Sequence, residues 1–438
     1  MTEAIRNNIA FYMLLIIWFV AGYISNVVPF VVIPVSVLLL RSKRMYGEIL
    51  MGFLFVLVLS DNLEAATEFA ETFKNVYIVM LLGIVAFDKS YFNWQNTIFR
   101  LYLPFFIVSA ACLMYSPVIS TAVQKNISYI ILFAVVPVYF RSVFEKEGVS
   151  FIRNFILFIV IILMIGVLFG YVNPEVAFSH GSRWRGIFGN PNGLGVFLIV
   201  TALLGTICFD LFPETFSRRF KIVFWAIILI VVLKSGSRTA LVAIIFFHLF
   251  IRINRISVFL SVFLFICLLA GTEFIINYSA TVVRFMGLQN VFRVDTLEDG
   301  SGRLVAWYFA WKNIEESIFI GRGFAFDEHL MRSNFDYLSR LGHEGGVHNT
   351  YLILWLNTGL VGLIFFLRGF FLSFISASKN SPLAIPAMFA IMFSINFEPW
   401  LAASLNPYTI LFLVVVVLLS ESVFRQHEKP VEENEEAV

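Results

Sequence analysis

The sequence predicts an all-α integral membrane protein with about twelve (12–14) transmembrane helices and one large outer loop that contains short helices. Hydrophobic residues make up 59% of the 438 residues, and the mean hydropathy is +0.86. Only 14% of the residues are charged, whereas about 25% is usual for a soluble protein. The apolar runs are about 15–22 residues long, which suits helices that cross a bilayer. Cys112, Cys208 and Cys267 all lie inside apolar runs, so they predict neither a disulfide framework nor a zinc site.

Fourteen apolar segments are candidates for these helices. In chain order they are 9–25, 27–40, 47–60, 75–88, 98–115, 127–144, 151–171, 192–211, 220–235, 238–252, 256–276, 348–367, 383–398 and 407–424. Several are short, and fused or re-entrant neighbours would reduce the number of crossings to twelve. The chain shows no convincing internal repeat.

The distribution of Lys and Arg predicts the orientation in the membrane. With a cytoplasmic N-terminus, the cytoplasmic loops contain the basic stretches 41–44, 141–148, 217–221 and 251–255. The loops on the other side, at 25–26, 61–74 and 115–126, are poor in Arg and partly acidic. Because short cytoplasmic loops carry an excess of Lys and Arg, both chain ends are expected in the cytoplasm.

The segment 277–347 is too long for a simple connection between two spans. It divides the chain into N-terminal transmembrane helices (1–276), the outer loop (277–347), C-terminal transmembrane helices (348–424) and an acidic cytoplasmic tail (425–438). Within the loop, GRLVAWYFAWKNIEES (302–317) predicts an amphipathic helix, lying on the membrane or packed on the bundle. Its large apolar residues recur at spacings of three and four: Leu304, Trp307, Tyr308 and Trp311.

Polar residues gather on the outer side, where topology does not require them. Two stretches before the loop, HGSRWRGIFGNPNGLG (180–195) and KSGSRTAL (234–241), contain Arg, and HNTYL begins at His348. The residues of interest are Arg183, Arg185, Asn190, Asn192, Arg238, Arg303, His348 and Asn349. Since outer loops are normally poor in Arg, these side chains predict a functional site at the membrane surface.

Arginine binds phosphate through two parallel charge-assisted hydrogen bonds, so several arginines at one membrane face favour a diphosphate ligand. A nearby histidine can accept a proton from a hydroxyl near neutral pH. Together they indicate group transfer from a lipid diphosphate. The sequence contains no Asp-x-Asp pair for a metal-bound nucleotide and no Gly-rich P-loop, and the acidic stretch 295–302 is interpreted as a solvated loop. No metal or other cofactor is expected, and no nucleic acid partner.

Four blocks in this order resemble the O-antigen ligase and O-antigen polymerase superfamily of bacterial envelope glycosyltransferases. They are RWRGIFGNPN (183–192), SGSRTALVA (235–243), SGRLVAWYFAWKNIEESIFIGRGF (301–324) and HNTYLILWLNTGLVGLI (348–364). The resemblance implies a multi-pass protein of the bacterial inner membrane with about twelve spans, cytoplasmic termini and an active site facing the periplasm. It also implies metal-independent, inverting transfer of glycan from an undecaprenyl-diphosphate carrier to a sugar hydroxyl of an acceptor glycan or a lipid A core.

The resemblance assigns roles to single residues. Arg183, Arg238 and Arg303 become candidate diphosphate ligands, and His348 becomes the candidate general base. Asn190, Asn192 and Asn349 would orient these groups or the glycan, although Asn190 and Asn192 also suit a turn and helix cap. Arg185 has no firm counterpart in the family, and Glu398 in FEPWL is a secondary candidate on the outer side.

Several functions fit this pattern. Many family ligases carry a second histidine directly before the His-Asn pair, where Gly346 and Val347 stand here, so a surface-polysaccharide polymerase is favoured over a ligase. A polysaccharide transporter would predict repeats and charges near mid-membrane, whereas the charges here cluster at one face. A scaffold subunit would have no need of the His348 block. Only an enzyme is expected to depend on a single imidazole.

Overall fold

The computed structural model describes residues 8–62, 64–179, 183–271, 303–343, 345–402 and 405–425. Within these residues, each of the fourteen predicted apolar segments contains an α-helix. In chain order these helices are α2 (Ile9–Ile24), α3 (Pro29–Ser42), α4 (Tyr46–Asp61), α5 (Glu68–Phe87), α6 (Thr97–Ala111), α7 (Ile119–Glu147), α8 (Val149–Val172), α10 (Pro191–Leu211), α11 (Arg218–Ser235), α12 (Arg238–Ile256), α13 (Val258–Ala270), α19 (Thr350–Ser378), α20 (Ala384–Phe397) and α21 (Pro407–Ser420).

Short elements connect them. They are the 3₁₀ turns η1 (Ala65–Thr67), η2 (Cys112–Tyr115), η3 (Pro213–Thr215) and η5 (Ser422–Phe424), the helices α9 (Pro174–Ala177), α16 (Arg303–Glu315), α17 (Phe326–Ser333) and α18 (Phe335–Arg340), and the strands β1 (Phe178–Ser179) and β2 (Arg183–Trp184). The strands pair antiparallel, with Phe178 opposite Trp184 and Ser179 opposite Arg183. The predicted loop helix is therefore present as α16. Its buried residues are the smaller Ala306, Ala310 and Ile314, while Leu304, Tyr308 and Trp311 face outward.

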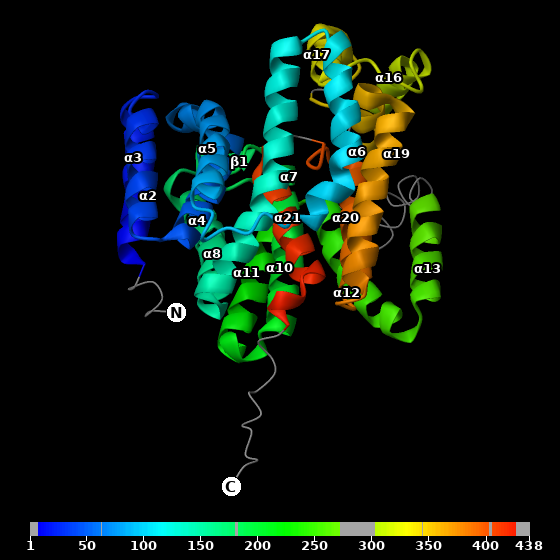
Figure 1. Ribbon diagram of the computed structural model, residues 1–438. Helices are drawn as coiled ribbons and strands as arrows, with labels where there is room; N and C mark the ends of the chain where they lie inside the picture. Colours follow the sequence, from blue (N-terminus) through cyan, green and yellow to red (C-terminus); the bar gives the residue numbers. More distant parts are fainter. Residues whose placement is uncertain are drawn as a thin grey trace.

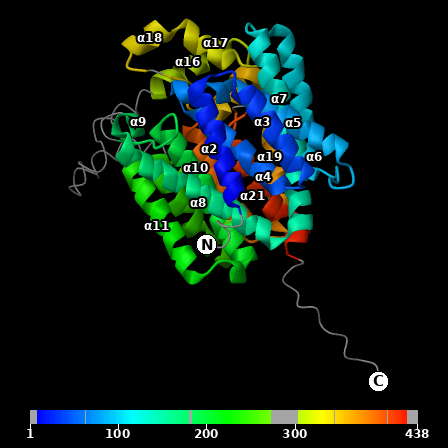
Figure 2. The ribbon, with the colours of Figure 1, turned by 90° about the vertical axis from the view of Figure 1, so that its left-hand side faces the viewer.

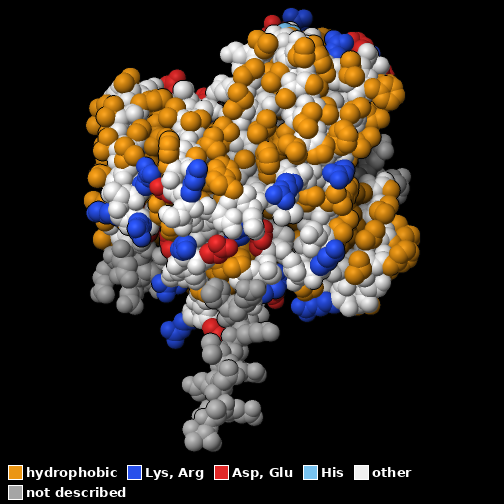
Figure 3. Space-filling model, viewed as in Figure 1, with side chains coloured by type: hydrophobic (Ala, Val, Ile, Leu, Met, Phe, Trp, Pro, Cys, Tyr) orange, Lys and Arg blue, Asp and Glu red, His pale blue; other side chains and the backbone are white. Residues whose placement is uncertain are grey.

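Helix length and composition indicate a membrane protein. In the described part of the chain, seven helices are long and apolar enough to cross a bilayer: α5 with η1, α6 with η2, α7, α8, α10, α12 and α19. Five shorter apolar helices accompany them: α2, α3, α13, α20 and α21. Figure 3 shows apolar side chains covering a broad band of one face, with Lys and Arg gathered along its lower border. The predicted all-α membrane fold is confirmed, and the number of crossings stays a prediction.

The two ends of the bundle differ. α2 begins and α21 ends near one end, where the turns between α10 and α11 and between α12 and α13 also lie (Figures 1 and 2). α16, α17 and α18 cover the opposite end. This arrangement separates the basic loops 217–221 and 251–255 from the loop helices, as the charge pattern predicts. The side of the membrane that each end faces stays a prediction.

The centre of the bundle is built around α21. Every residue from Pro407 to Leu419 is buried, because the run of Val and Leu leaves no polar face for solvent. Asn406 caps the helix by accepting hydrogen bonds from the backbone N–H groups of Tyr408 and Thr409, at 3.0 and 2.7 Å. The long helices α7 and α10 pack against it, so the core is a helix buried among helices.

α19 is broken at Gly359, which has φ 68° and ψ −179°. The chain between α16 and α17 inserts at this break. The N–H of Leu360 donates to the carbonyl of Ile318 at 2.8 Å, and the N–H of Arg322 donates to the carbonyl of Leu356 at 2.8 Å. Gly321 and Gly359 face each other so closely that a Cβ on either residue would overlap the other backbone. These two glycines therefore fix the loop helices to the membrane bundle.

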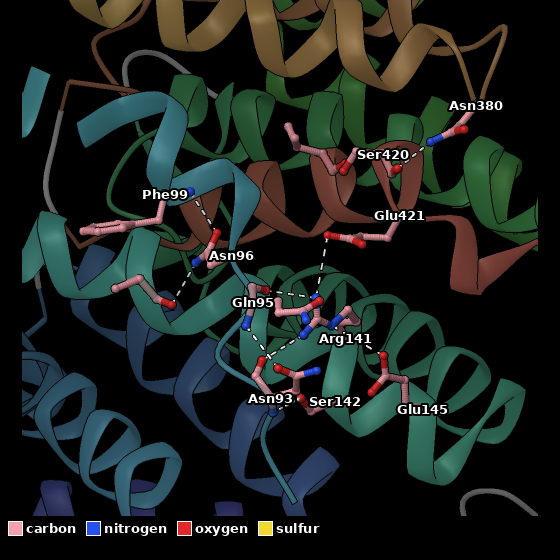
Figure 4. A network of polar contacts seen from close by, with 12 residues as sticks. Asn93, Gln95, Asn96, Phe99, Arg141, Ser142, Glu145, Asn380, Ser420 and Glu421 are labelled. Atoms are coloured by element: carbon pink, nitrogen blue, oxygen red, sulfur yellow. Dashed lines mark hydrogen bonds and ion pairs between the residues drawn. The ribbon is translucent and has the colours of Figure 1, made fainter. Parts of the chain in front are cut away.

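A buried arginine fixes the opposite end (Figure 4). Arg141 of α7 is 6% exposed, and its guanidinium donates to the carbonyls of Gln95 and Asn93 at 2.9 and 2.8 Å. Glu145 and Glu421 lie 3.5 and 4.0 Å from it. Arg141 thus joins α7 to the segment before α6 and to the end of α21.

Replacement of Arg141 by alanine is expected to destabilise the protein by about 3 kcal/mol, because two buried carbonyls lose a charged donor. The midpoint of thermal unfolding in detergent measures this loss. Arg153→Ala, at an exposed position of α8, provides the control and should leave the midpoint nearly unchanged. Equal midpoints for the two variants would show that the Arg141 network contributes little.

Candidate active site

The hairpin of β1 and β2 carries Arg183 to the corner between α11 and α12. The Nε of Arg183 donates to the carbonyl of Ser235 at 2.9 Å, and its Nη2 donates to Asn192 Oδ1 at 2.7 Å and to the carbonyl of Gly236 at 3.4 Å. Gly236 adopts a left-handed conformation (φ 58°) that ends α11. The guanidinium is therefore held in place by α10 and by the α11–α12 corner.

Arg238 begins α12, two residues after Gly236. Ser237 caps this helix by accepting a hydrogen bond from the N–H of Ala240 at 3.4 Å. The corner that receives Arg183 therefore also positions Arg238. Two of the predicted diphosphate ligands, 55 residues apart in the sequence, belong to one local structure.

Arg185 has a different environment. It donates to the carbonyls of Val176 and Gly189 at 2.5 and 3.1 Å, and it forms an ion pair with Glu64 at 3.0 Å. These contacts hold the 176–189 segment in shape, which favours a structural role over substrate binding. Asn190 caps α10 by accepting from the N–H of Gly193 at 2.8 Å, a structural role as well.

The segment before α19 positions His348. Asn349 caps α19 by accepting from the N–H of Leu352 at 3.0 Å, and its Nδ2 donates to Asn396 Oδ1 at 3.2 Å. The next residue, Thr350, donates its hydroxyl to the carbonyl of Glu398 at 2.9 Å. His348 itself has φ 52°, a left-handed backbone that is uncommon for a residue other than glycine. The predicted orienting role of Asn349 is consistent with these contacts.

Glu398 links two predicted site residues. Its Oε1 accepts a hydrogen bond from Arg303 Nη2 at 2.6 Å, and its Oε2 lies 4.0 Å from His348 Nδ1. The Glu398 side chain is 6% exposed, whereas those of Arg303 and His348 are 19% and 28% exposed. Guanidinium, carboxylate and imidazole therefore form one cluster, contributed by α16, the end of α20 and the start of α19. The sequence had indicated Glu398 only as a secondary candidate.

Electrostatics keeps the imidazole neutral. Burial, the charge of Arg303 and the neighbouring His343 lower the pKa of His348 to about 4. Burial raises the pKa of Glu398, and the positive charges of Arg303 and Arg183 oppose that rise. A neutral imidazole near pH 7 can accept a proton from a hydroxyl. The influence of Arg183 on Glu398 relates the hairpin arginine to the same cluster.

Residues 222–367, about one third of the chain, match the model of the family described as O-antigen ligase. This match confirms the resemblance to the O-antigen ligase and polymerase superfamily, and it supports a membrane glycosyltransferase activity of that type. No curated protein matches the chain.

The matched segment, residues 222–367, contains Arg238, Arg303, His348 and Asn349. Arg183, Arg185 and Asn190 precede it, and Glu398 follows it. Two contacts therefore connect the matched segment to the rest of the bundle: that between Arg303 and Glu398, and that between Arg183 and the α11–α12 corner. The predicted acidic stretch 295–302 lies outside the described residues.

Replacement of Arg303 by glutamine is expected to raise the pKa of His348, because the positive charge of Arg303 lowers that pKa. His348 is the predicted general base in its neutral form, so activity is expected to fall as the pH drops through this pKa. The kcat/KM of the wild type should stay nearly flat from about pH 8 to pH 5, whereas that of the variant should decline on the acid side. Arg322→Gln changes a partly exposed arginine at the same end and should leave the profile unchanged. Identical profiles would contradict the electrostatic coupling.

Proposed function

We propose that this protein is a surface-polysaccharide polymerase of the bacterial inner membrane, with cytoplasmic termini and a site that faces the periplasm. It transfers glycan from an undecaprenyl-diphosphate carrier to a sugar hydroxyl, with inversion and without a metal ion. The Arg303–Glu398–His348 cluster carries the proposal, because it combines a cation for phosphate with an oriented neutral base at the end of the bundle covered by α16–α18.

The chemistry assigns one task to each group. His348 accepts the proton of the acceptor hydroxyl, and the hydroxyl oxygen attacks the anomeric carbon of the donor. The bond between that carbon and the diphosphate oxygen breaks, and the diphosphate leaves with the electron pair. Arg183, Arg238 and Arg303 stabilise the negative charge that grows on the leaving group. The carboxylate of Glu398, 4.0 Å from Nδ1, stabilises the protonated imidazole through its charge.

A specific observation supports a ligase as the second candidate. His343 lies beside His348, with ring centroids 5.9 Å apart, although four residues separate the two in the sequence. Its Nε2 donates to the carbonyl of Gly346 at 3.1 Å, so the ring is held at the site. His343 therefore places a second histidine next to His348 in the fold, whereas many family ligases carry theirs directly before the His-Asn pair in the sequence.

A gel profile of surface glycan separates these functions. In a deletion strain, lipid A cores that carry one repeat and no ladder indicate a polymerase. Bare cores with long glycan accumulating on the carrier indicate a ligase. Complementation with the wild type must restore the ladder, and Arg238→Ala should fail to restore it while the protein is present in the membrane. A normal ladder from Arg238→Ala would contradict the assignment of Arg238 as a diphosphate ligand.

A further inference from the structure

A groove of about 420 Å³ lies between α7, α17 and the start of α19, and the segment directly before His348 contributes to its lining. Its polar lining comes from Lys125, Asp327, Glu328, Arg332 and Asn357, and Gly345 and Gly346 form one wall. We call it the α17 groove. Its volume lies within the range of about 300–1,000 Å³ that is typical of small-molecule sites. We propose that the α17 groove binds the acceptor saccharide of the proposed glycosyl transfer.

The orientation of the imidazole supports this role. Nδ1 of His348 faces Glu398, 4.0 Å away. Nε2 faces Gly345, where an added Cβ would lie 3.0 Å from it. The ring therefore stands between the Arg303–Glu398 pair and the glycine wall of the groove. A base in this position can take a proton from a hydroxyl on the groove side.

Inversion requires the acceptor oxygen to approach the anomeric carbon from the side opposite to the leaving diphosphate. The arginines that hold the diphosphate include Arg303, which contacts Glu398 on the Nδ1 side of the ring. The acceptor hydroxyl then lies on the Nε2 side, toward Gly345 and Gly346. The α17 groove, which Gly345 and Gly346 line, lies on that side.

The lining of the groove suits a saccharide better than a diphosphate. Lys125 and Arg332 are matched by Asp327 and Glu328, so the formal charges cancel. Carboxylate, amide and guanidinium groups hydrogen-bond with hydroxyls, and the 51% exposed ring of Phe335 offers an apolar face for a sugar ring. Charged side chains also gather over this end of the molecule, beyond the apolar band (Figure 3). These features favour a polar, uncharged ligand in water.

Two contacts hold the groove open. Asn357 of α19 accepts from the N–H of Asp327 at 3.0 Å and donates to Asp327 Oδ1 at 2.8 Å. Lys125 of α7 forms an ion pair with Glu328 of α17. Since α7 and α19 both anchor α17, the groove keeps its shape without a ligand, which lowers the cost of ordering it on binding.

Two soluble probes test the proposal on the purified full-length protein in detergent. The first is the repeat-unit saccharide of the host strain, released from its carrier by mild acid, and the second is inorganic diphosphate. Ligand-observed NMR titration gives a Kd for each probe. Phe335→Ala and Arg332→Ala should weaken saccharide binding about tenfold and leave diphosphate binding unchanged. Arg238→Ala should show the reverse pattern.

Tyr337→Ala and Arg340→Ala serve as matched controls, because both residues are exposed on α18 and neither lines the groove. The proposal is overturned if the wild type does not bind the saccharide, or if the groove variants bind it as tightly as the controls do. It is also overturned if Arg238→Ala alone abolishes saccharide binding. The proposed function fails separately, in cells, if His348→Ala restores the glycan ladder whatever the binding results are.

A glycine substitution tests which face of the ring the saccharide meets. Gly345→Ala places a methyl group beside Nε2 and should lower kcat about tenfold. Gly342→Ala controls for backbone strain, because Gly342 also has a positive φ (78°) but has open space around its Cβ position. Unchanged kcat in Gly345→Ala, or an equal loss in Gly342→Ala, would overturn the assignment of Nε2 to the groove side.

Discussion

Replacement of His348 by alanine is expected to lower the rate of glycan transfer by about 10²- to 10⁴-fold, the usual contribution of a general base. The imidazole is neutral near pH 7, its Nδ1 lies 4.0 Å from Glu398 Oε2, and its Nε2 lies next to Gly345, which lines the α17 groove. No other described side chain combines these properties at the cluster. In cells, the variant should reproduce the glycan profile of the deletion strain.

The measurement is the glycan ladder from the complemented deletion strain, with immunoblotting of the membrane fraction to show that the variant accumulates. His329→Ala is the matched control, because His329 lies in α17 at the same end and belongs to no part of the cluster. It should restore the ladder. A wild-type ladder from His348→Ala would remove the general-base assignment and favour a transporter or a scaffold.

Replacement of Gly359 by alanine is expected to prevent correct folding. A left-handed backbone costs an alanine about 1–2 kcal/mol. In addition, the new Cβ would overlap the backbone carbonyl of Phe319, which cannot move without breaking the hydrogen bonds that dock the 318–322 segment into α19. The total penalty should exceed about 4 kcal/mol, a large share of the stability of a folded protein.

Size-exclusion chromatography in detergent measures the fraction of Gly359→Ala that elutes as a single folded species, and this fraction should fall sharply. Gly148→Ala separates strain from overlap, since Gly148 has a similar φ of 64° and open space around its Cβ position. The Gly148→Ala variant should lose only the stability that a left-handed backbone costs an alanine. Similar yields of the two variants would show that the docked segment tolerates displacement.

The sequence predicted the helices well because each apolar run is long and is bounded by polar or basic loops. The fourteen helices follow the predicted segments with shifts at their ends, such as α19, which continues to Ser378 instead of ending near residue 367. The break inside α19 was not predicted. Gly359 in the sequence NTG (357–359) marks the position of the break, but only the insertion of residues 318–322 explains it. That insertion joins segments about forty residues apart in the sequence.

The candidate site was predicted in part. Two of the sequence blocks that resemble the family contain Arg303, His348 and Asn349. The structure places these residues at one end of the bundle. The link that Glu398 provides depends on how α20 packs against α19, which no local pattern reveals. Arg185 and Arg183 look equivalent in the sequence, yet one pairs with Glu64 and the other holds the α11–α12 corner. Their different partners come from tertiary packing.

The carboxylate of Glu398 also has a consequence for biogenesis. Arg303 and His348 leave the ribosome well before Glu398, which follows α20 and precedes the final helix. A nascent chain therefore carries the base and the cation without the group that connects them. The proposed catalytic cluster is completed only when the last helical hairpin has been synthesised, so under the proposed mechanism a partly synthesised protein is expected to be inactive.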